Sequence, residues 1–222
     1  MNLKVVDLGT NLGNAIGEFL RRGKQYFTDL DEIQPEECLG VDKQGRFEAD
    51  LTQRGYNFSE ADLTKIDLDV LPEADYYLAW DCLEQLPSPD WSAAVLQIML
   101  HKARRGIWLR MPSFEPEGLS SEQTLKAMNL RFAWTTWPCN TSHFTLQHMA
   151  NALSGYKQAS GREFADVVVQ ASKTVLASGD PWVVPASAPL DTQKYSPTLG
   201  LKPSVKFNPP LVAQWNVLVK FG

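Results

Sequence analysis

The chain has 222 residues, a length that fits one large domain with a full hydrophobic core. Its composition, 44% hydrophobic and 21% charged, is ordinary for a globular protein. The formal net charge of −5 argues against a protein built to grip nucleic acid, because no basic excess is available to neutralise phosphates. The three cysteines are far apart and form no CxxC pair, so a reduced chain without disulfides is expected.

The sequence has neither a cationic start followed by an apolar core nor an apolar run long enough to span a bilayer. We therefore expect a cytoplasmic protein that makes no membrane contact.

The first twenty residues combine an apolar strand, a glycine turn and a helix. Val5, Val6 and Leu8 predict a short buried strand, and Gly9 and Gly13 follow where a tight turn brings backbone close to a ligand. The next apolar positions have helical spacing: Ala15, Ile16, Phe19 and Leu20. This order is how α/β proteins place backbone N–H groups and a helix N-terminus against a nucleotide or anion.

The end of that first helix is predicted from its charges and a glycine. Arg21 and Arg22 are cations at the negative end of the helix dipole, and Gly23 is expected to supply the left-handed residue after the helix.

The rest of the pattern alternates strands and helices. In chain order, strands are expected at 38–42, 56–59, 76–80, 107–109, 167–169 and 215–219, and helices from Phe47 to Gly55, from a Ser88 cap with Pro89 to 104–106, and from a Thr145 cap to Gly155. This order predicts an α/β fold with a doubly wound, mostly parallel sheet.

Residues 178–210 hold seven of the chain's 14 prolines. This density favours an extended loop on the surface, because proline removes a hydrogen-bond donor. We therefore expect one domain over 1–222 with a proline-rich surface insertion before the last strand.

Acidic side chains stand at the carboxyl ends of successive predicted strands, where open parallel sheets bind ligands. They are Asp7, Asp42, Asp62 and Asp81. Carboxylates accept hydrogen bonds from ribose hydroxyls and from the adenine amino group. The turn is G-x-x-x-G, Asp42 follows Gly13 by about 29 residues, and no Gly-Lys-Ser/Thr is present, so neither common phosphate-cradling motif fits. A ligand without phosphates fits better.

These residues resemble the motifs of class I S-adenosylmethionine-dependent methyltransferases, and the resemblance runs from Leu3 to about Tyr156. The matching segments are Asp7-Leu8-Gly9-Thr10-Asn11-Leu12-Gly13, Leu39-Gly40-Val41-Asp42, Ala61-Asp62, Ala74 to Leu86, and Phe144-Thr145 opening a helix that ends at Gly155-Tyr156. Asn11 stands where the family has a glycine, and Asn is the residue that next best tolerates left-handed backbone. Gln85 stands where a His is frequent.

The resemblance implies an α/β fold with a doubly wound, mostly parallel seven-stranded Rossmann-like sheet and a C-terminal antiparallel strand. It also implies S-adenosyl-L-methionine as cosubstrate and S-adenosyl-L-homocysteine as product. The residues expected to contact it are Asp7, Gly9, Thr10, Asn11, Gly13, Asp42, Lys43, Ala61, Asp62, Trp80 and Asp81.

Two residues are candidates for accepting a proton from the methyl acceptor. His143 precedes a helix in the region that faces the acceptor in such proteins, although it also fits a capping or structural role. Asp81 is the second candidate, or it orients the methionine part of the donor. Trp80, Trp134 and Trp137 either wall the acceptor pocket or pack in the core. No His, Cys or Asp cluster has metal-ligand spacing, so no metal is expected.

The predicted function is methylation of an oxygen or nitrogen of a small molecule, such as a metabolite or sugar, with no nucleic acid partner. The alternative is a non-catalytic adenosyl-binding or interaction domain of the same fold. The acceptor and the oligomeric state stay open at this point, because acceptor specificity in this fold lies in irregular loops.

Overall fold

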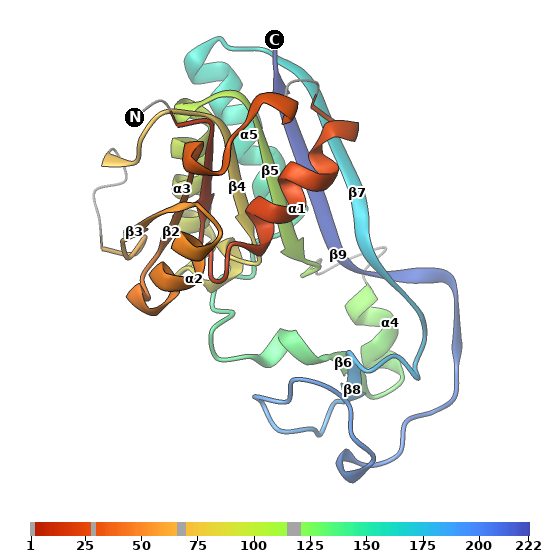
Figure 1. Cartoon of the computed structure of the whole chain (residues 1–222). Helices are drawn as coiled ribbons and strands as arrows, with labels where there is room; N and C mark the ends of the chain where they lie inside the picture. The colour runs from red at the N-terminus through yellow and green to blue at the C-terminus, as the bar shows by residue number, and fades with distance from the viewer. Residues whose placement is uncertain (1–2, 28–29, 66–69, 115–120) are drawn as a thin grey trace.

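The structure is a computed structural model that describes residues 3–27, 30–65, 70–114 and 121–222. Its main sheet has seven strands in the order β3-β2-β1-β4-β5-β9-β7 (Figure 1). The strands are β1 Val5–Leu8, β2 Cys38–Asp42, β3 Asn57–Glu60, β4 Ala74–Trp80, β5 Ala103–Pro112, β7 Phe164–Ala177 and β9 Lys206–Phe221. The first five are parallel, and β9 is antiparallel to both β5 and β7. This confirms the predicted mostly parallel sheet with an antiparallel C-terminal strand.

Helices cover both faces of the sheet. In Figure 1, α1 (Asn14–Arg22) and α2 (Glu48–Gln53) lie in front, and α3 (Pro89–Lys102) and α5 (Leu146–Ser160) lie behind. Two hydrophobic cores form between these layers, one with Phe19 of α1 and one with Leu96 of α3. Within the described part of the chain, none of the helices is long and apolar enough to cross a membrane.

The helix starts agree with the predicted caps. The Ser88 hydroxyl accepts a hydrogen bond from the Trp91 backbone N–H at 3.2 Å, and the Thr145 hydroxyl accepts one from the His148 N–H at 3.3 Å. Each satisfies one of the free N–H groups of a helix first turn.

Neither Gly23 nor Gly155 ends a helix as predicted. Gly23 has a right-handed φ of −58°, and the chain continues into a short 3₁₀ turn, Gly23–Gln25. The absence of a side chain at Gly23 instead leaves room for Leu30, since a Cβ on Gly23 would lie 2.4 Å from Leu30 Cδ1. Gly155 lies inside α5, and the left-handed cap is Gly161 with a φ of 68°.

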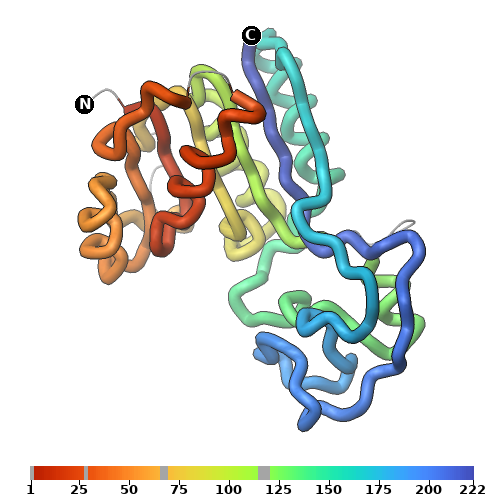
Figure 2. Tube along the Cα trace, turned by 45° about the vertical axis from the view of Figure 1, so that its right-hand side comes forward, coloured from red at the N-terminus to blue at the C-terminus, as the bar shows by residue number. Residues whose placement is uncertain are grey.

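Strand lengths also differ from prediction. β5 begins at Ala103, within the predicted end of the preceding helix, because its first residue already pairs with Ala74 of β4. β7 and β9 are far longer than 167–169 and 215–219 and run side by side beyond the helical layers (Figure 2). Most of β7 is solvent-exposed at the sheet edge, so its sequence carries no continuous apolar pattern.

A small lobe lies beyond the carboxyl ends of the parallel strands (Figure 1). It contains α4 (Ser121–Ala127) and a two-stranded antiparallel sheet of β6 (Leu130–Phe132) and β8 (Val183–Pro185). Residues 178–210 were expected to lack regular structure, but β8 falls within them and β9 begins at Lys206. Neither β6 nor β8 was predicted, since each has only three residues.

The guanidinium of Arg131 joins the two halves of this lobe. Its Nη1 donates to the carbonyls of Phe132 and Ala133 at 3.3 and 3.2 Å, and its Nη2 donates to those of Ala188 and Pro189, both at 3.0 Å. Segments almost sixty residues apart in sequence are thereby held by one side chain.

We expect Arg131→Gln to lower the free energy of unfolding of the lobe by about 2 kcal/mol, because carbonyls that pair with a charged donor lose it. The matched control is Arg21→Gln, which removes a surface pair with Glu18 and should cost less than about 0.5 kcal/mol. Urea denaturation followed by tryptophan fluorescence measures both. Equal losses would show that the Arg131 contacts do not stabilise the lobe.

Candidate functional site

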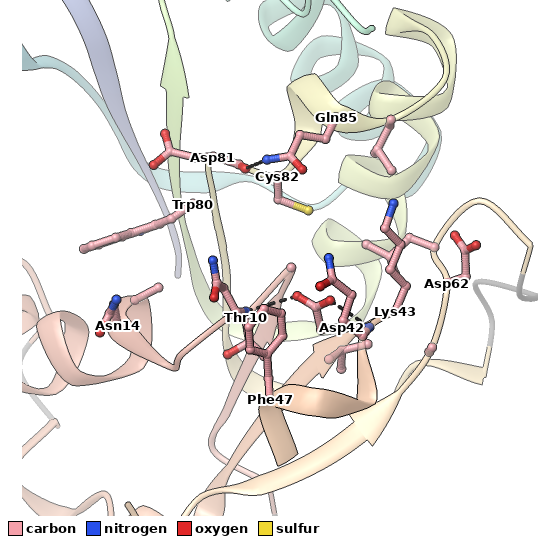
Figure 3. A pocket seen from close by; sticks show the side chains of 18 of the residues that line it. Thr10, Asn14, Asp42, Lys43, Phe47, Asp62, Trp80, Asp81, Cys82 and Gln85 are labelled. Carbon is pink, nitrogen blue, oxygen red and sulfur yellow. Dashed lines mark hydrogen bonds between the residues drawn. The ribbon is translucent and has the colours of Figure 1, made fainter. Parts of the chain in front are cut away.

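A cavity of about 340 Å³ lies at the carboxyl ends of β1, β2, β3 and β4 (Figure 3). This is the point where the strand order reverses around β1, the usual ligand position in open parallel sheets. Nine predicted cofactor residues line it: Gly9, Thr10, Asn11, Asp42, Lys43, Ala61, Asp62, Trp80 and Asp81. Asp7 ends up beneath the turn as a buried side chain, and Gly13 is the N-cap residue of α1.

The turn after β1 has the left-handed backbone that its sequence predicts. Gly9, Asn11 and Gly13 have φ values of 68°, 48° and 70°, which confirms that Asn11 adopts the conformation of the glycine it replaces. A Cβ on Gly9 would lie 2.8 Å from Cys82 Sγ, so glycine is required for the close approach of β1 and β4.

The Asp42 carboxylate is held by two backbone N–H groups. Its Oδ2 accepts from Asn11 N at 3.1 Å and its Oδ1 from Gln44 N at 3.0 Å. Each carboxylate oxygen can accept a second hydrogen bond. A rigid acceptor for ligand hydroxyls therefore stands at the end of β2.

The Asp62 carboxylate shapes its own turn. Its Oδ1 accepts from the hydroxyl and N–H of Thr64 at 2.7 and 3.0 Å, and its Oδ2 lies 3.2 Å from Lys65 Nζ. The Thr64 hydroxyl, with the other two contacts, lowers the pKa of Asp62 to about 2. This side chain is therefore ionised at any physiological pH.

Asp81 connects three strands at the rim of the cavity. Its Oδ2 accepts from Arg110 Nε at 3.0 Å and also from Arg110 Nη2, and its Oδ1 accepts from Gln214 Nε2 at 2.9 Å. Asp81 has an unusual φ of 51°, and the Arg110 guanidinium lies 4.4 Å from the centre of the Trp80 ring. Both carboxylate oxygens of Asp81 thus already accept hydrogen bonds. These contacts with Arg110 and Gln214 hold Asp81 in its strained backbone conformation.

Asp7 is 1% exposed, and neither of its oxygens has a hydrogen-bond partner of normal geometry among the described residues. Burial raises the pKa of Asp7 to about 7, with a further rise from the charge of Asp42. The nearby Thr10 hydroxyl and the charge of Arg110 offset only part of this rise. Asp7 therefore holds its proton to a much higher pH than an exposed aspartate does.

A second buried acid, Glu84, was not predicted as a site residue. It is 3% exposed, and its Oε2 has no partner in the part of the chain that the structure describes. Burial, followed by the nearby charge of Asp81, raises the pKa of Glu84 well above its usual range. Two features of the sequence could have drawn attention to Glu84. It lies in the Ala74 to Leu86 segment that resembles the family, and it directly precedes Gln85, which lines the cavity.

The structure places the other predicted residues apart from this cavity. His143 is exposed and stacks on Phe114, with ring centres 4.7 Å apart. Trp134 is buried in the core of the lobe, and Trp137 Nε1 donates to the Thr192 carbonyl at 2.9 Å. Of the three predicted tryptophans, Trp80 is the one that lines the cavity.

Several wall residues were missed from sequence. Asn14, Gln44, Arg46, Phe47 and Arg110 line the cavity although no motif named them as site residues. Within the described residues, no group of three His, Cys, Asp or Glu side chains could hold a metal ion.

No protein-family model matches the sequence, and no curated protein sequence matches it. Solved structures do. A SAM-dependent methyltransferase from Archaeoglobus fulgidus is 14% identical, with a TM-score of 0.56 over 99% of this chain and 86% of that one. One from Methanosarcina mazei is 10% identical, with a TM-score of 0.50 over 99% and 92%. The small RNA methyltransferase HEN1 is 12% identical, with a TM-score of 0.54 over 99% of this chain but 23% of its own length. The chain has the class I S-adenosylmethionine-dependent methyltransferase fold.

The raised pKa of Asp7 predicts a pH-dependent stability difference between wild type and Asp7→Asn. The wild-type carboxyl is neutral in the folded chain up to about pH 7 but ionises near pH 4 when unfolded, so its contribution to stability falls as pH rises between these values. The amide cannot ionise. We expect the variant to gain on wild type across that window, by up to about 4 kcal/mol at pH 8.

Urea denaturation at pH 4.5 and at pH 8 measures this difference. Asp50→Asn, at an exposed acid of α2, is the control and should show no such trend. A constant difference between Asp7→Asn and wild type would contradict the raised pKa.

Proposed function

We propose that this chain binds S-adenosyl-L-methionine in the cavity at β1–β4 and transfers its methyl group to a small-molecule acceptor. The observation that carries the proposal is the Asp42 carboxylate, fixed by the N–H groups of Asn11 and Gln44 beside the glycine turn. A rigid acceptor at the end of β2 suits the paired hydroxyls of a ribose. The methyltransferase fold supports the same ligand.

The order of wall residues suits an adenosyl compound along the strand ends. Ala61 and Asp62 would flank the adenine, Asp42 and Lys43 the ribose, and the turn from Gly9 to Asn11 the methionine part. Trp80 and Asp81 would then lie nearest the sulfonium, whose positive charge is attracted to an aromatic face and to a carboxylate.

The reaction is an in-line displacement. The acceptor heteroatom bonds to the methyl carbon as the C–S bond breaks, and the bonding electron pair stays on sulfur, which becomes the neutral thioether of S-adenosyl-L-homocysteine. A proton on the acceptor atom leaves to a base or to water. The chain's part is to align donor and acceptor.

A small-molecule acceptor is supported by charge. With a net charge of −5 the chain has no basic excess for a nucleic acid backbone. We propose oxygen or nitrogen methylation of a metabolite or sugar, carried out by residues 1–222 as one domain.

Two residues remain proposed proton acceptors, and they occupy different places. Asp81 is at the cavity but already accepts from Arg110 and Gln214. His143 is exposed on the loop before α5, where its ring covers Phe114. The position of the bound acceptor decides between them.

Calorimetry tests donor binding. We expect S-adenosyl-L-methionine and S-adenosyl-L-homocysteine to bind and NAD to give no heat. Asp42→Asn should weaken both by at least about 10-fold, because an amide has only one acceptor atom for two backbone N–H groups and the ribose. Asp50→Asn should bind like wild type. Absence of heat with either adenosyl ligand would contradict the proposal.

Transfer is tested with methyl-labelled donor against a panel of small oxygen and nitrogen acceptors, with RNA and protein as separate arms. We expect label in a small molecule. A fall in kcat by about 100-fold at unchanged donor affinity in His143→Ala or in Asp81→Asn would identify the base. Label in RNA or protein would overturn the acceptor class. Tight donor binding without transfer across all arms would favour the non-catalytic adenosyl-binding domain.

A further inference from the structure

A second cavity of about 340 Å³ lies on the α1 side of the sheet, between α1 and strands β5, β9 and β7. It shares Asn14, Trp80 and Arg110 with the proposed donor cavity. In Figure 3 the ring of Trp80 lies above Asn14 and points away from Asp42, and this residue lines both cavities. A ligand here would be next to the methionine end of the donor.

The floor of this α1-side cavity is aromatic. The rings of Trp80 and Trp108 meet edge to face with centres 5.1 Å apart, and Tyr26 packs on Trp108 with centres 5.6 Å apart. The hydroxyl of Tyr26 is held by Gln170 Nε2 at 2.7 Å. Flat aromatic walls favour a planar ligand that can stack or pack edge to face.

The charges of the lining favour an anion. Arg22 and Arg110 both line the cavity, and each pairs with a single carboxylate, Glu18 and Asp81 respectively. Among the described residues that line the cavity, two guanidinium groups, of Arg22 and Arg110, stand against one carboxylate, of Glu18. The lining therefore carries one positive charge in excess, and Arg offers forked donors to a ligand carboxylate.

We propose that this α1-side cavity is the acceptor subsite and takes a planar aromatic or heteroaromatic compound that carries an anionic substituent. The inference rests on the proposed methyl transfer, since it places the acceptor beside the donor's methionine end. The ring packs on Trp80 and Trp108, and the anionic group faces Arg22 or Arg110. The ionised side chains that such an acceptor meets in the described lining are Glu18, Arg22 and Arg110.

The test is NMR of the indole N–H resonances in protein saturated with S-adenosyl-L-homocysteine, assigned by single Trp→Phe variants. The probes are 4-hydroxybenzoate and nicotinate, with 4-hydroxybenzyl alcohol as the uncharged comparison. We expect both anions to shift the Trp80 and Trp108 resonances saturably, and the alcohol to bind at least 5-fold more weakly.

Matched variants on β7 locate the binding. Ser172 lines the cavity, and Ser172→Trp should fill it and weaken the anions at least 10-fold. Val169 is exposed and lies three residues before Ser172, on the opposite face of the strand, so Val169→Trp should leave binding unchanged. Both variants place the same bulky side chain on an exposed strand position, which controls for effects on folding.

Saturable shifts of Trp134 and Trp137 without shifts of Trp80 and Trp108 would overturn the proposal and place the acceptor at the lobe. Absence of any saturable shift with both anions would overturn it as well. These outcomes can be told apart from failure of the proposed function, because the binding of S-adenosyl-L-homocysteine is measured first by calorimetry. If that ligand does not bind, methyl transfer fails, and the same titration without it still tests the cavity.

Discussion

The close contact of β1 with its two neighbours is the constraint on which the rest of the site depends. The N–H groups of Gly9 and Thr10 both donate to the Val41 carbonyl, at 2.8 and 3.2 Å, which bends the chain over the end of β2. Side-chain atoms are excluded where these strands meet, since a Cβ on Gly9 would strike Cys82 and one on Gly40 would lie 2.7 Å from Thr10. This close spacing lets the backbone N–H of Asn11 reach the Asp42 carboxylate at the end of β2.

A second set of contacts ties the far half of the sheet to the same edge. Asp81 follows β4, Arg110 is on β5, and Gln214 is on β9, so one carboxylate gathers side chains from three strands. The antiparallel register of β9, with Pro112 opposite Gln214, is what brings that amide into reach. The strained Asp81 backbone and the Arg110 guanidinium over the Trp80 ring belong to this same set of contacts.

The lobe shows how the long hairpin of β7 and β9 extends the fold. Its core draws on residues from both strands, Val175 and Leu211, together with Phe132 and Val183 from the short β6–β8 sheet. Because the hairpin continues past the helical layers, the lobe lies at the carboxyl edge of the sheet, the side on which the ligand cavity opens (Figure 1, Figure 2). The half-buried guanidinium of Arg131 holds it from within, and this partial burial lowers the pKa of Arg131.

The sequence by itself determined the elements whose signals are local: the strand, glycine turn and helix at the start, the Ser88 and Thr145 caps, and the acids that follow successive strands. These follow from hydrophobic spacing and backbone preference within a few residues. Tertiary structure alone decided contacts between distant segments. Gln214 meets Asp81 across 133 positions and Gln170 meets Tyr26 across 144, and no local pattern encodes such pairs. The buried state of Asp7 and Glu84, and hence their raised pKa values, likewise depends on neighbours that only the folded sheet supplies.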